Sequence, residues 1–253
     1  MYAEERQAHI ARLAHELGRV EVTALARELD VTTETIRRDL TALERRGTLR
    51  RVHGGAIPLE RLGFEPELET RHEAMTAEKD RIAKAALDEL PAEGSIVLDA
   101  GSTTARFADL LPTDRELTVV TNALNIAVRL ATRPNLNVLV LGGRVRGRTL
   151  AAVDVWALQL LSTVFVDVAF MATNGISVER GLTTPDATEA AIKREMIAHA
   201  RRVVLLTDHT KVGNDHLIRF GDADDVETLV TDSGLDAELA DDLTAAGIRV
   251  VTA

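Results

Sequence analysis

Arginine is concentrated in one short stretch near the N-terminus. Between Ile36 and His53 there are six arginines against one aspartate and one glutamate, a local charge of +4 in a chain whose net charge is −10. Ile36, Leu40 and Leu43 are spaced to share one face of a helix and to pack inward. The arginines of that helix are therefore expected to face solvent. An exposed, arginine-rich helix favours a polyanionic partner, and duplex DNA is the first candidate.

A second group of residues suited to binding follows a predicted strand, in the order Asp99-Ala100-Gly101-Ser102-Thr103-Thr104. Small residues let the backbone approach an anion, hydroxyl groups donate hydrogen bonds, and the first N–H groups of a helix favour negative charge. The pattern indicates a phosphate site, although such residues also begin helices for purely structural reasons. A second strand end, Thr121-Asn122, has the same two interpretations. A third, Leu141-Gly142-Gly143, either lets the backbone approach a ligand closely or is a plain turn.

Several other chemistries are disfavoured. The stretch GGRVRGRT, residues 142–149, has the spacing of a phosphate-binding P-loop, but Arg148 stands where a compact lysine is needed. No Gly-x-Gly-x-x-Gly motif follows a strand, cysteine is absent, and the seven histidines show no metal-site spacing. We therefore expect no NTPase activity, no cofactor and no metal.

The arginine-rich helix belongs to a predicted winged helix-turn-helix domain over residues 1–57. A first helix ends at Gly18, a strand follows at Val20–Val22, Thr23 caps a second helix, and Thr32 or Thr33 caps a third that runs to about Arg46 and ends at Gly47. Thr48–Val52 and Ala56–Ile57 form the wing. We expect base edges or flanking phosphates to be reached by Thr33, Thr35, Arg37 and Arg38, and backbone phosphates by Arg50, Arg51 and His53.

Residues 58–76 are predicted to be a linker and residues 77–253 an α/β domain. Its apolar runs are Ile96–Leu98, Leu117–Val120, Val138–Leu141, Val166–Met171, Val203–Leu206, Leu229–Val230 and Arg249–Val251, and amphipathic segments lie between them at 78–90, 104–111, 123–132, 154–163, 186–200 and 236–246. Nearly all-apolar strands that alternate with helices predict a mainly parallel, Rossmann-like sheet with both faces covered. In such sheets ligands bind at the carboxyl ends of the strands.

Two sets of motifs resemble one family. The run Thr33-Glu34-Thr35-Ile36-Arg37-Arg38-Asp39-Leu40, then Leu43, Gly47, Leu49 and Arg51-Val52-His53-Gly54-Gly55-Ala56, is similar to the signature of the DeoR family of bacterial transcription regulators. Gly175-Ile176, Gly181-Leu182-Thr183-Thr184-Pro185, Glu189 to Met196 and Asp208-His209-Thr210-Lys211 are similar to the effector domain of that family. The resemblance covers nearly the whole chain.

The resemblance implies a sugar-phosphate sensor with a phosphosugar-isomerase-like fold, related to ribose-5-phosphate isomerase. On this interpretation phosphate is held by Ser102, Thr103 and Thr104, with Lys211 as counter-charge. The sugar hydroxyl groups are bound, or the conformation of the loops is fixed, by Asp99, Asn122, Glu189 and Lys193. The candidate effector site is completed by Gly101, Thr121, Gly142 and Gly143. For Glu189 and Lys193 the alternative is an exposed ion pair one helical turn apart.

We expect a DNA-binding transcriptional regulator, more specifically a repressor of a sugar or sugar-phosphate catabolic operon that a phosphorylated sugar releases from double-stranded operator DNA. Helix-turn-helix proteins usually read paired half-sites, so a homo-oligomer, dimer or tetramer, is expected. No apolar run approaches the roughly 20 residues that span a bilayer. A cytoplasmic location without a membrane partner is therefore expected.

The alternative is a phosphosugar isomerase-like enzyme with an appended DNA-binding domain. Isomerisation needs a carboxylate base, and the resemblance places an aspartate in the loop that here reads Thr173-Asn174-Gly175-Ile176-Ser177. Neither Asn174 nor Ser177 can be that base. Asp99, Glu189 and Asp208 remain available, but we expect the protein not to be an enzyme.

Overall fold

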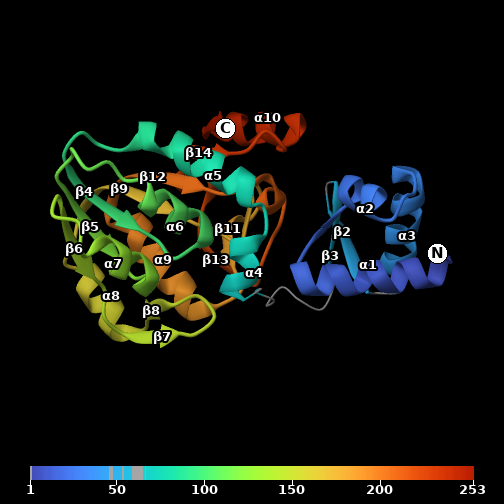
Figure 1. Ribbon diagram of the computed structural model, residues 1–253, viewed down its shortest axis with the longest axis horizontal. Coiled ribbons are helices and arrows are strands. Elements are labelled where there is room, and N and C mark those ends of the chain that lie inside the picture. The colour runs from blue at the N-terminus through green and yellow to red at the C-terminus, as the bar shows by residue number, and fades with distance from the viewer. Residues whose placement is uncertain (1, 46–47, 53, 59–64, 66) are drawn as a thin grey trace. The chain divides into compact units, whose positions relative to one another are not determined.

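The computed structural model describes residues 2–45, 48–52, 54–58, 65 and 67–253. The chain divides into two compact units, Met1–Pro66 and Glu67–Ala253 (Figure 1). Of the range 58–76 in which the sequence predicts a linker, Leu68–Glu73 form helix α4, which belongs to the second unit and packs on helix α6 (Ser102–Asp109). Within the described ranges, no helix is long and apolar enough to cross a membrane.

Among its described residues, the first unit contains three helices: α1 (Ala3–Leu17), α2 (Val22–Glu28) and α3 (Thr33–Arg45). Gly18 ends α1 in the left-handed conformation, with φ of 81°, which a glycine adopts without strain. Ile36, Leu40 and Leu43 are buried against Ile10, as their spacing predicts. The third helix is capped by Thr32, whose Oγ1 accepts a hydrogen bond from the Thr35 N–H at 3.2 Å.

One predicted cap is wrong. Helix α2 begins at Val22 with Glu21 in the N-cap position, not at Thr23. The reason is the preceding strand β1 (Val20–Glu21), which runs directly into the helix while the Val22 N–H donates to the Gly54 carbonyl at 2.9 Å.

The wing has the predicted form. Strands β2 (Leu49–Val52) and β3 (Gly55–Pro58) are antiparallel, and β1 pairs with the other side of β3. A side chain at Gly55 would place its Cβ 2.1 Å from the Val20 carbonyl oxygen, so this close approach of two strands requires glycine. The predicted helix-turn-helix fold with a wing is confirmed.

The second unit is organised around a seven-stranded parallel sheet with the strand order β15-β14-β12-β9-β4-β5-β6. The strands are β4 (Gly94–Leu98), β5 (Leu117–Thr121), β6 (Leu136–Val140), β9 (Val166–Met171), β12 (Ala200–Leu206), β14 (Thr228–Thr231) and β15 (Arg249–Thr252). Six of them contain one of the apolar runs found in the sequence, and β6 contains all of the run Val138–Leu141 except Leu141. The predicted α/β architecture with a parallel sheet is therefore confirmed.

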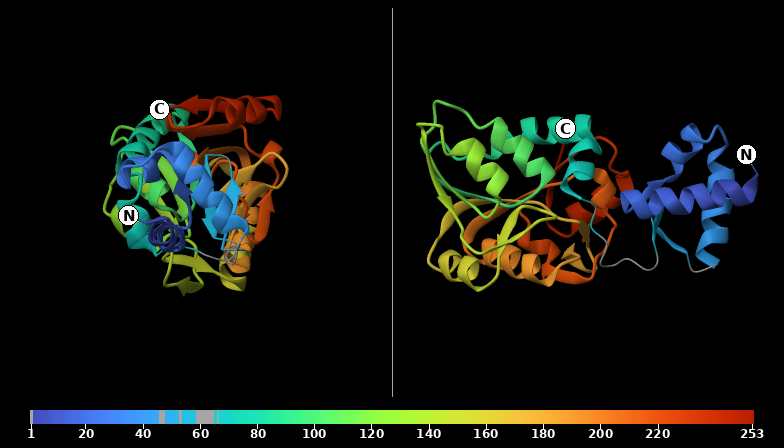
Figure 2. Two further views of the ribbon diagram at one scale, coloured as in Figure 1. Left: turned by 90° about the vertical axis from the view of Figure 1, so that its right-hand side faces the viewer. Right: turned by 60° about the horizontal axis from the view of Figure 1, so that its bottom comes forward.

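Helices cover both faces of this sheet, as the right panel of Figure 2 shows. On one face α5 (Thr76–Ala85) packs on α6, and α6 packs on α7 (Leu124–Leu130); on the other α8 (Val155–Leu161) packs on α9 (Ala187–Ala198). The remaining helix, α10 (Ala237–Ala245), precedes β15, and short 3-10 helices are η1 (Ala86–Glu89), η2 (His209–Lys211) and η3 (Ala223–Asp225). The rings of Phe107 and Phe170 meet in the core at 4.4 Å between centroids.

The sequence pattern misses two small antiparallel elements. One is the hairpin of β7 (Arg144–Arg146) and β8 (Ala151–Val153); the other is a sheet of β10 (Gly175–Ser177), β11 (Gly181–Thr184) and β13 (Ile218–Gly221). Strands of three or four residues are too short to show a two-residue period. Both elements follow carboxyl ends of the parallel strands.

The order of the strands contains one topological switch point. From β4 the chain proceeds to β5 and β6 on one side, whereas β9, β12, β14 and β15 follow on the other side. The connections that follow β4 and β9 therefore lead to opposite faces of the sheet, and doubly wound sheets bind ligands at such a switch point. Asp99 directly follows β4, at this switch point.

Candidate functional site

Two exposed arginines of helix α3, Arg37 and Arg38, belong to the DNA-reading surface that the sequence predicts. The side chains of Arg37 and Arg38 are 57% and 81% exposed, and both reach toward Glu34, at 3.9 and 3.6 Å. Thr33 and Thr35 lie half-buried in the first turn of the same helix. All four side chains thus belong to the N-terminal half of one helix, the part that a recognition helix presents to the major groove.

The wing arginines differ from one another. The Arg51 N–H donates to Glu44 at 2.9 Å, and the Arg51 guanidinium donates to the Thr41 hydroxyl at 3.2 Å, so this side chain bridges β2 and α3. Arg50 is half-buried on the same strand. His53, the third predicted wing residue, lies outside the described residues, as do Arg46 and Gly47.

Sequence reasoning overlooked the role of Asp39 in holding α3. This carboxylate is buried and accepts hydrogen bonds from Arg6 Nε at 2.6 Å and from Gln7 Nε2 at 2.8 Å, both on α1. The sequence contained a sign of this role, because Asp39 is a charged residue on the helical face that the apolar residues of α3 share. Asp39 fixes the helix that presents Arg37 and Arg38.

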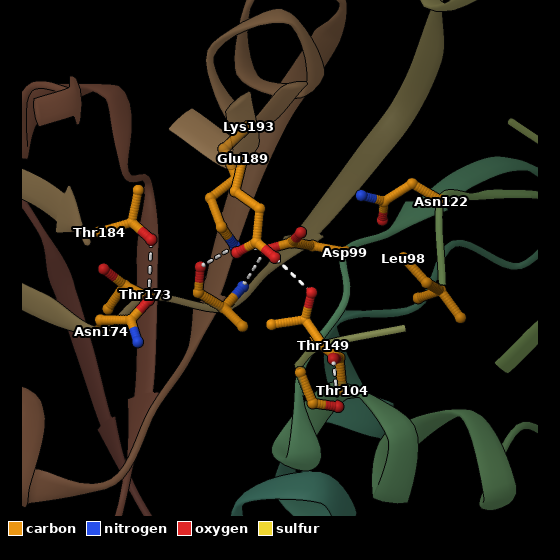
Figure 3. A network of polar contacts seen from close by, with 12 residues as sticks. Leu98, Asp99, Thr104, Asn122, Thr149, Thr173, Asn174, Thr184, Glu189 and Lys193 are labelled. Carbon is orange, nitrogen blue, oxygen red and sulfur yellow. Dashed lines mark hydrogen bonds and ion pairs between the residues drawn. The ribbon is translucent and has the colours of Figure 1, made fainter. Parts of the chain in front are cut away.

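In the second unit, Asp99 is fully buried at the switch point and forms an ion pair with Lys193 of α9 (Figure 3). One carboxylate oxygen also accepts the Ala172 N–H at 3.0 Å, and Lys193 donates to the Ala172 carbonyl at 3.0 Å. Burial raises the pKa of Asp99 above its usual value, against the opposing effect of the Lys193 ammonium. The network thus joins the ends of β4 and β9 through α9.

Glu189 and Lys193 do not form the exposed ion pair considered from the sequence; that alternative is wrong. Both side chains are buried, 4% and 3% exposed, and they have different partners. Glu189 accepts from Arg146 Nη1 at 2.5 Å and from the Thr149 hydroxyl, which Figure 3 shows beside it.

Arg146 and Thr149 were not among the predicted site residues. They lie in the P-loop-like stretch 142–149, which contains strand β7 and so does not run from a strand into a helix as a P-loop does. The arginine also approaches Asp186 at 3.3 Å. The stretch thus contains two residues that contact Glu189, a candidate site residue, and it does not form a P-loop.

The predicted phosphate cradle is the N-terminus of α6. Gly101 occupies the N-cap position and provides no side-chain cap, and Ser102, Thr103 and Thr104 supply the first turn, nearly buried. A Cβ at Gly101 would lie 2.7 Å from the Cβ of Ala172, so glycine is required for the loop after β4 to approach the loop after β9. The Thr104 hydroxyl donates to the Gly101 carbonyl at 3.0 Å.

The other predicted strand-end residues divide into two kinds. Thr121 has a structural role, because its hydroxyl donates to the Leu98 carbonyl at 2.7 Å and accepts from the Ala123 N–H at 3.0 Å. Gly143 is likewise required by the β7–β8 hairpin, since its φ is +144° and a Cβ would lie 2.4 Å from the Val153 carbonyl oxygen. Asn122 is buried, and its amide Nδ2 makes a long contact of 3.4 Å with the Ala152 carbonyl. A Cβ at Gly142 would make only an ordinary contact of 3.9 Å with Leu160, so its surroundings do not require glycine.

Lys211 belongs to a second group of residues, which follows β12. Asp208 is buried there and accepts the Thr210 N–H at 3.2 Å. His209 Nδ1 lies 2.7 Å from the Asp232 carboxylate; burial opposes ionisation of Asp232, but hydrogen bonds from His209 and Gly234 hold its pKa below the usual value. Lys211 and Asp208 are also close enough to Lys79 to alter its pKa.

Comparison with known proteins assigns both units. Residues 6–61 match the model of the DeoR-like helix-turn-helix domain, and residues 74–233 match that of the DeoR C terminal sensor domain. The HTH-type transcriptional regulator GlpR of Haloferax volcanii is 36% identical, with 99% of this chain and 98% of that protein covered. GolR of Listeria innocua is 33% identical, with 99% of this chain and 98% of that protein covered. The putative aga operon transcriptional repressor of Escherichia coli O157:H7 is 30% identical, with 98% of this chain and 93% of that protein covered. The chain belongs to the DeoR family of transcriptional regulators and carries its DNA-binding helix-turn-helix domain.

Proposed function

We propose that this regulator is a repressor whose second unit binds a phosphorylated sugar at the carboxyl ends of β4, β5 and β9 and thereby loses affinity for its operator. The regulated genes are those of a sugar or sugar-phosphate catabolic operon. The protein acts as a homo-oligomer and not as an enzyme. Its effector residues are those around Asp99 at the switch point, with Lys211 as counter-charge to the phosphate.

The observation that carries this proposal is a pair of buried acceptor atoms. Asp99 Oδ1 and Asn122 Oδ1 have no hydrogen-bond partner among the residues that the structure describes. Leaving a buried acceptor without a partner costs about 1–3 kcal/mol. Sugar hydroxyl groups are donors that satisfy such atoms, and the uncapped first turn of α6 suits a phosphate.

A melting experiment tests the effector site. The chain is heated with fructose 1-phosphate, glycerol 3-phosphate, tagatose phosphate or galactitol phosphate, each also supplied as the unphosphorylated compound. A ligand present at about 100 times its dissociation constant stabilises the folded protein by about 2.7 kcal/mol. The matching phosphate ester is expected to raise the melting temperature and the free polyol or sugar is not.

Two variants locate that effect. Asn122→Ala removes one acceptor and is expected to abolish the shift, and Lys211→Gln is expected to weaken it. Lys84→Gln removes the same charge from an exposed position on α5 and should leave the shift unchanged. A full shift in both site variants would refute the proposed site, and no shift with any phosphate ester would refute the proposed ligand class.

A binding experiment tests the DNA surface, using a duplex selected from a random pool. Arg37→Ala or Arg38→Ala should relax sequence preference by about 1–3 kcal/mol for each bidentate base contact. Arg50→Ala should weaken all sequences alike and reduce the salt slope by about one. Arg219→Ala is the control, because that side chain is 59% exposed, close to the 57% of Arg37, but lies in the second unit. Unchanged affinity in the Arg37→Ala/Arg38→Ala double variant would refute the placement of the reading surface.

Isomerase activity is the second candidate, because Asp99 is a buried carboxylate at the candidate site whose pKa burial raises, and isomerisation needs a carboxylate base. Against it, Asp99 is already held by Lys193 and Ala172. Turnover of ribose 5-phosphate or glucosamine 6-phosphate that disappears in Asp99→Asn would establish an enzyme and overturn our proposal on this point.

A further inference from the structure

The two edges of the seven-stranded sheet differ in chemistry. Strand β15 begins with Arg249, whose charged side chain is half exposed at its edge. Strand β6, at the other edge, has the sequence LNVLV, with no charge, no proline and no bulge in its pairing with β5. Its outer side pairs with no strand that the structure describes. An open, uncharged edge of this kind invites another strand, and natural proteins usually protect or cover it.

An apolar surface adjoins this edge. Leu139 and Val140 of β6 are each 44% exposed, and on α8 the exposed fractions are 61% for Val155, 72% for Trp156 and 48% for Leu160. A Cβ at Gly142, two residues beyond β6, would lie 3.9 Å from Leu160, so strand end and helix are neighbours. We call these five side chains the edge patch. Figure 1 shows β6 and α8 on the same side of the second unit.

The edge patch lies on elements without charged residues, and this indicates which partner covers it. Neither β6 nor α8, with the sequence VWALQLL, contains a charged residue, in a chain with 28% charged residues and a net charge of −10. Two copies of so acidic a chain repel one another over most of their surface, and a neutral patch is where they can approach. At its border Arg144 and Asp154 form an ion pair of 2.6 Å, which offers both signs of charge to an identical neighbour.

We propose that the edge patch is the interface with a second copy of this chain, formed by antiparallel pairing of β6 with β6 about a two-fold axis, flanked by α8 from each copy. Such an isologous contact uses the same residues on both sides, and antiparallel strands of identical sequence satisfy it. The open N–H and C=O groups of β6 then find partners, and the exposed side chains of α8 become buried. The inference rests on the proposed function only in that two copies supply two reading helices for paired half-sites.

Sedimentation of the full chain at micromolar concentration tests the interface without operator or sugar phosphate, so its outcome is independent of the effector and DNA experiments. Leu139→Glu places a carboxylate on the edge and is expected to halve the mass of the assembly. Leu217→Glu is the matched control, since Leu217 is also exposed, at 58%, but lies outside β6 and α8. A monomeric wild-type chain, or a Leu139→Glu assembly of wild-type mass, would overturn the proposal.

Cross-linking reports the pairing even where a charged variant folds poorly. Because the chain has no cysteine, Asn137→Cys, Val138→Cys and Leu139→Cys each introduce a single thiol. The position nearest the two-fold axis should give a covalent dimer on mild oxidation, with less at the next positions and none for Leu217→Cys. Equal cross-linking at all four positions, or none at any position in β6, would refute β6 pairing.

Fluorescence gives a third measurement, because Trp156 is the sole tryptophan. Dilution of the wild-type chain should shift its emission to the red as copies separate, and Leu139→Glu should show the red-shifted emission at every concentration. Emission typical of a solvent-exposed indole in the wild-type chain at all concentrations would exclude α8 from the interface.

Discussion

At the scale of single residues, Lys79 is a side chain whose pKa the fold strongly lowers. It is buried on α5, and its amine donates to the carbonyls of Arg71 at 2.5 Å and Ala74 at 2.7 Å, which end helix α4. Burial is the main cause that lowers the pKa of Lys79 from 10.5 to about 8. The negative charge of Asp208 opposes this decrease, and the positive charge of Lys211 adds to it. Lys79 therefore ties α5 to the end of α4 and is influenced by the charges of the residues after β12.

This pKa makes a prediction about stability. Between pH 8 and 10.5 the unfolded chain keeps a proton on Lys79 that the folded chain has released, so the free energy of unfolding rises with pH in this window, by at most about 3 kcal/mol. Urea unfolding of the wild-type chain and of Lys79→Met at pH 7.5 and pH 10 isolates the effect. The difference in free energy of unfolding between the wild-type chain and the variant should shift in favour of the wild-type chain from pH 7.5 to pH 10. A difference that does not vary with pH would contradict the assignment.

The candidate site shows how far single residues could be predicted. Asp99, Glu189 and Lys193 were expected in one site from their resemblance to a family, and they do lie close together. Their pairing was not predictable, because helical spacing alone joins Glu189 to Lys193, whereas tertiary packing gives each a partner from a distant segment. Burial decides the matter: an ion in the interior needs a partner close by, and the nearest opposite charge in the sequence need not supply it.

At the scale of elements, long and strongly patterned segments were predictable and short ones were not. All seven parallel strands carry apolar runs, so the main sheet could be inferred from sequence. The β7–β8 hairpin could not, because its strands have three residues each and its stretch 142–149 has the composition of a loop. This hairpin provides Arg146, a partner of Glu189, so part of the candidate site was lost with it.

Helix α3 depends on an internal anchor, which gives a second prediction. Asp39→Ala leaves the nearly buried guanidinium of Arg6 without this carboxylate, and breaking a buried pair costs about 3–5 kcal/mol. The first unit should lose stability of this order and DNA affinity should fall with it, although Asp39 is buried and faces α1. Thermal unfolding and operator binding measure the two effects.

The comparison with Arg37→Ala separates anchoring from reading. Arg37 is exposed on α3, so its removal should lower operator affinity while the melting temperature remains that of the wild-type chain. The melting temperature of Asp39→Asn should lie between those of the wild-type chain and Asp39→Ala. The amide oxygen of the asparagine still accepts a hydrogen bond from Gln7, but it carries no charge to pair with Arg6. If Asp39→Ala unfolded at the wild-type temperature, the anchoring role would be disproved.

At the scale of the whole molecule, charge divides unevenly along the chain. Residues 1–57 contain ten arginines against nine acidic residues, a net charge of +1, so the remaining residues carry −11. An acidic second unit repels DNA and confines attraction to the reading surface. Specific binding to a short operator, and not general adhesion to nucleic acid, is the expected consequence.

Regulation by a sugar phosphate imposes a reciprocal relation between the two units. If the effector weakens operator binding by some factor, operator DNA must weaken effector binding by the same factor, with a coupling free energy of typically about 1–3 kcal/mol. Calorimetric titration of the phosphate ester into the free chain and into the operator complex measures one half of the cycle, and operator titrations with and without the ester measure the other. The two factors should agree. Asn122→Ala should keep operator affinity but lose its sensitivity to the ester, and an ester affinity that is identical with and without operator would exclude release by this effector.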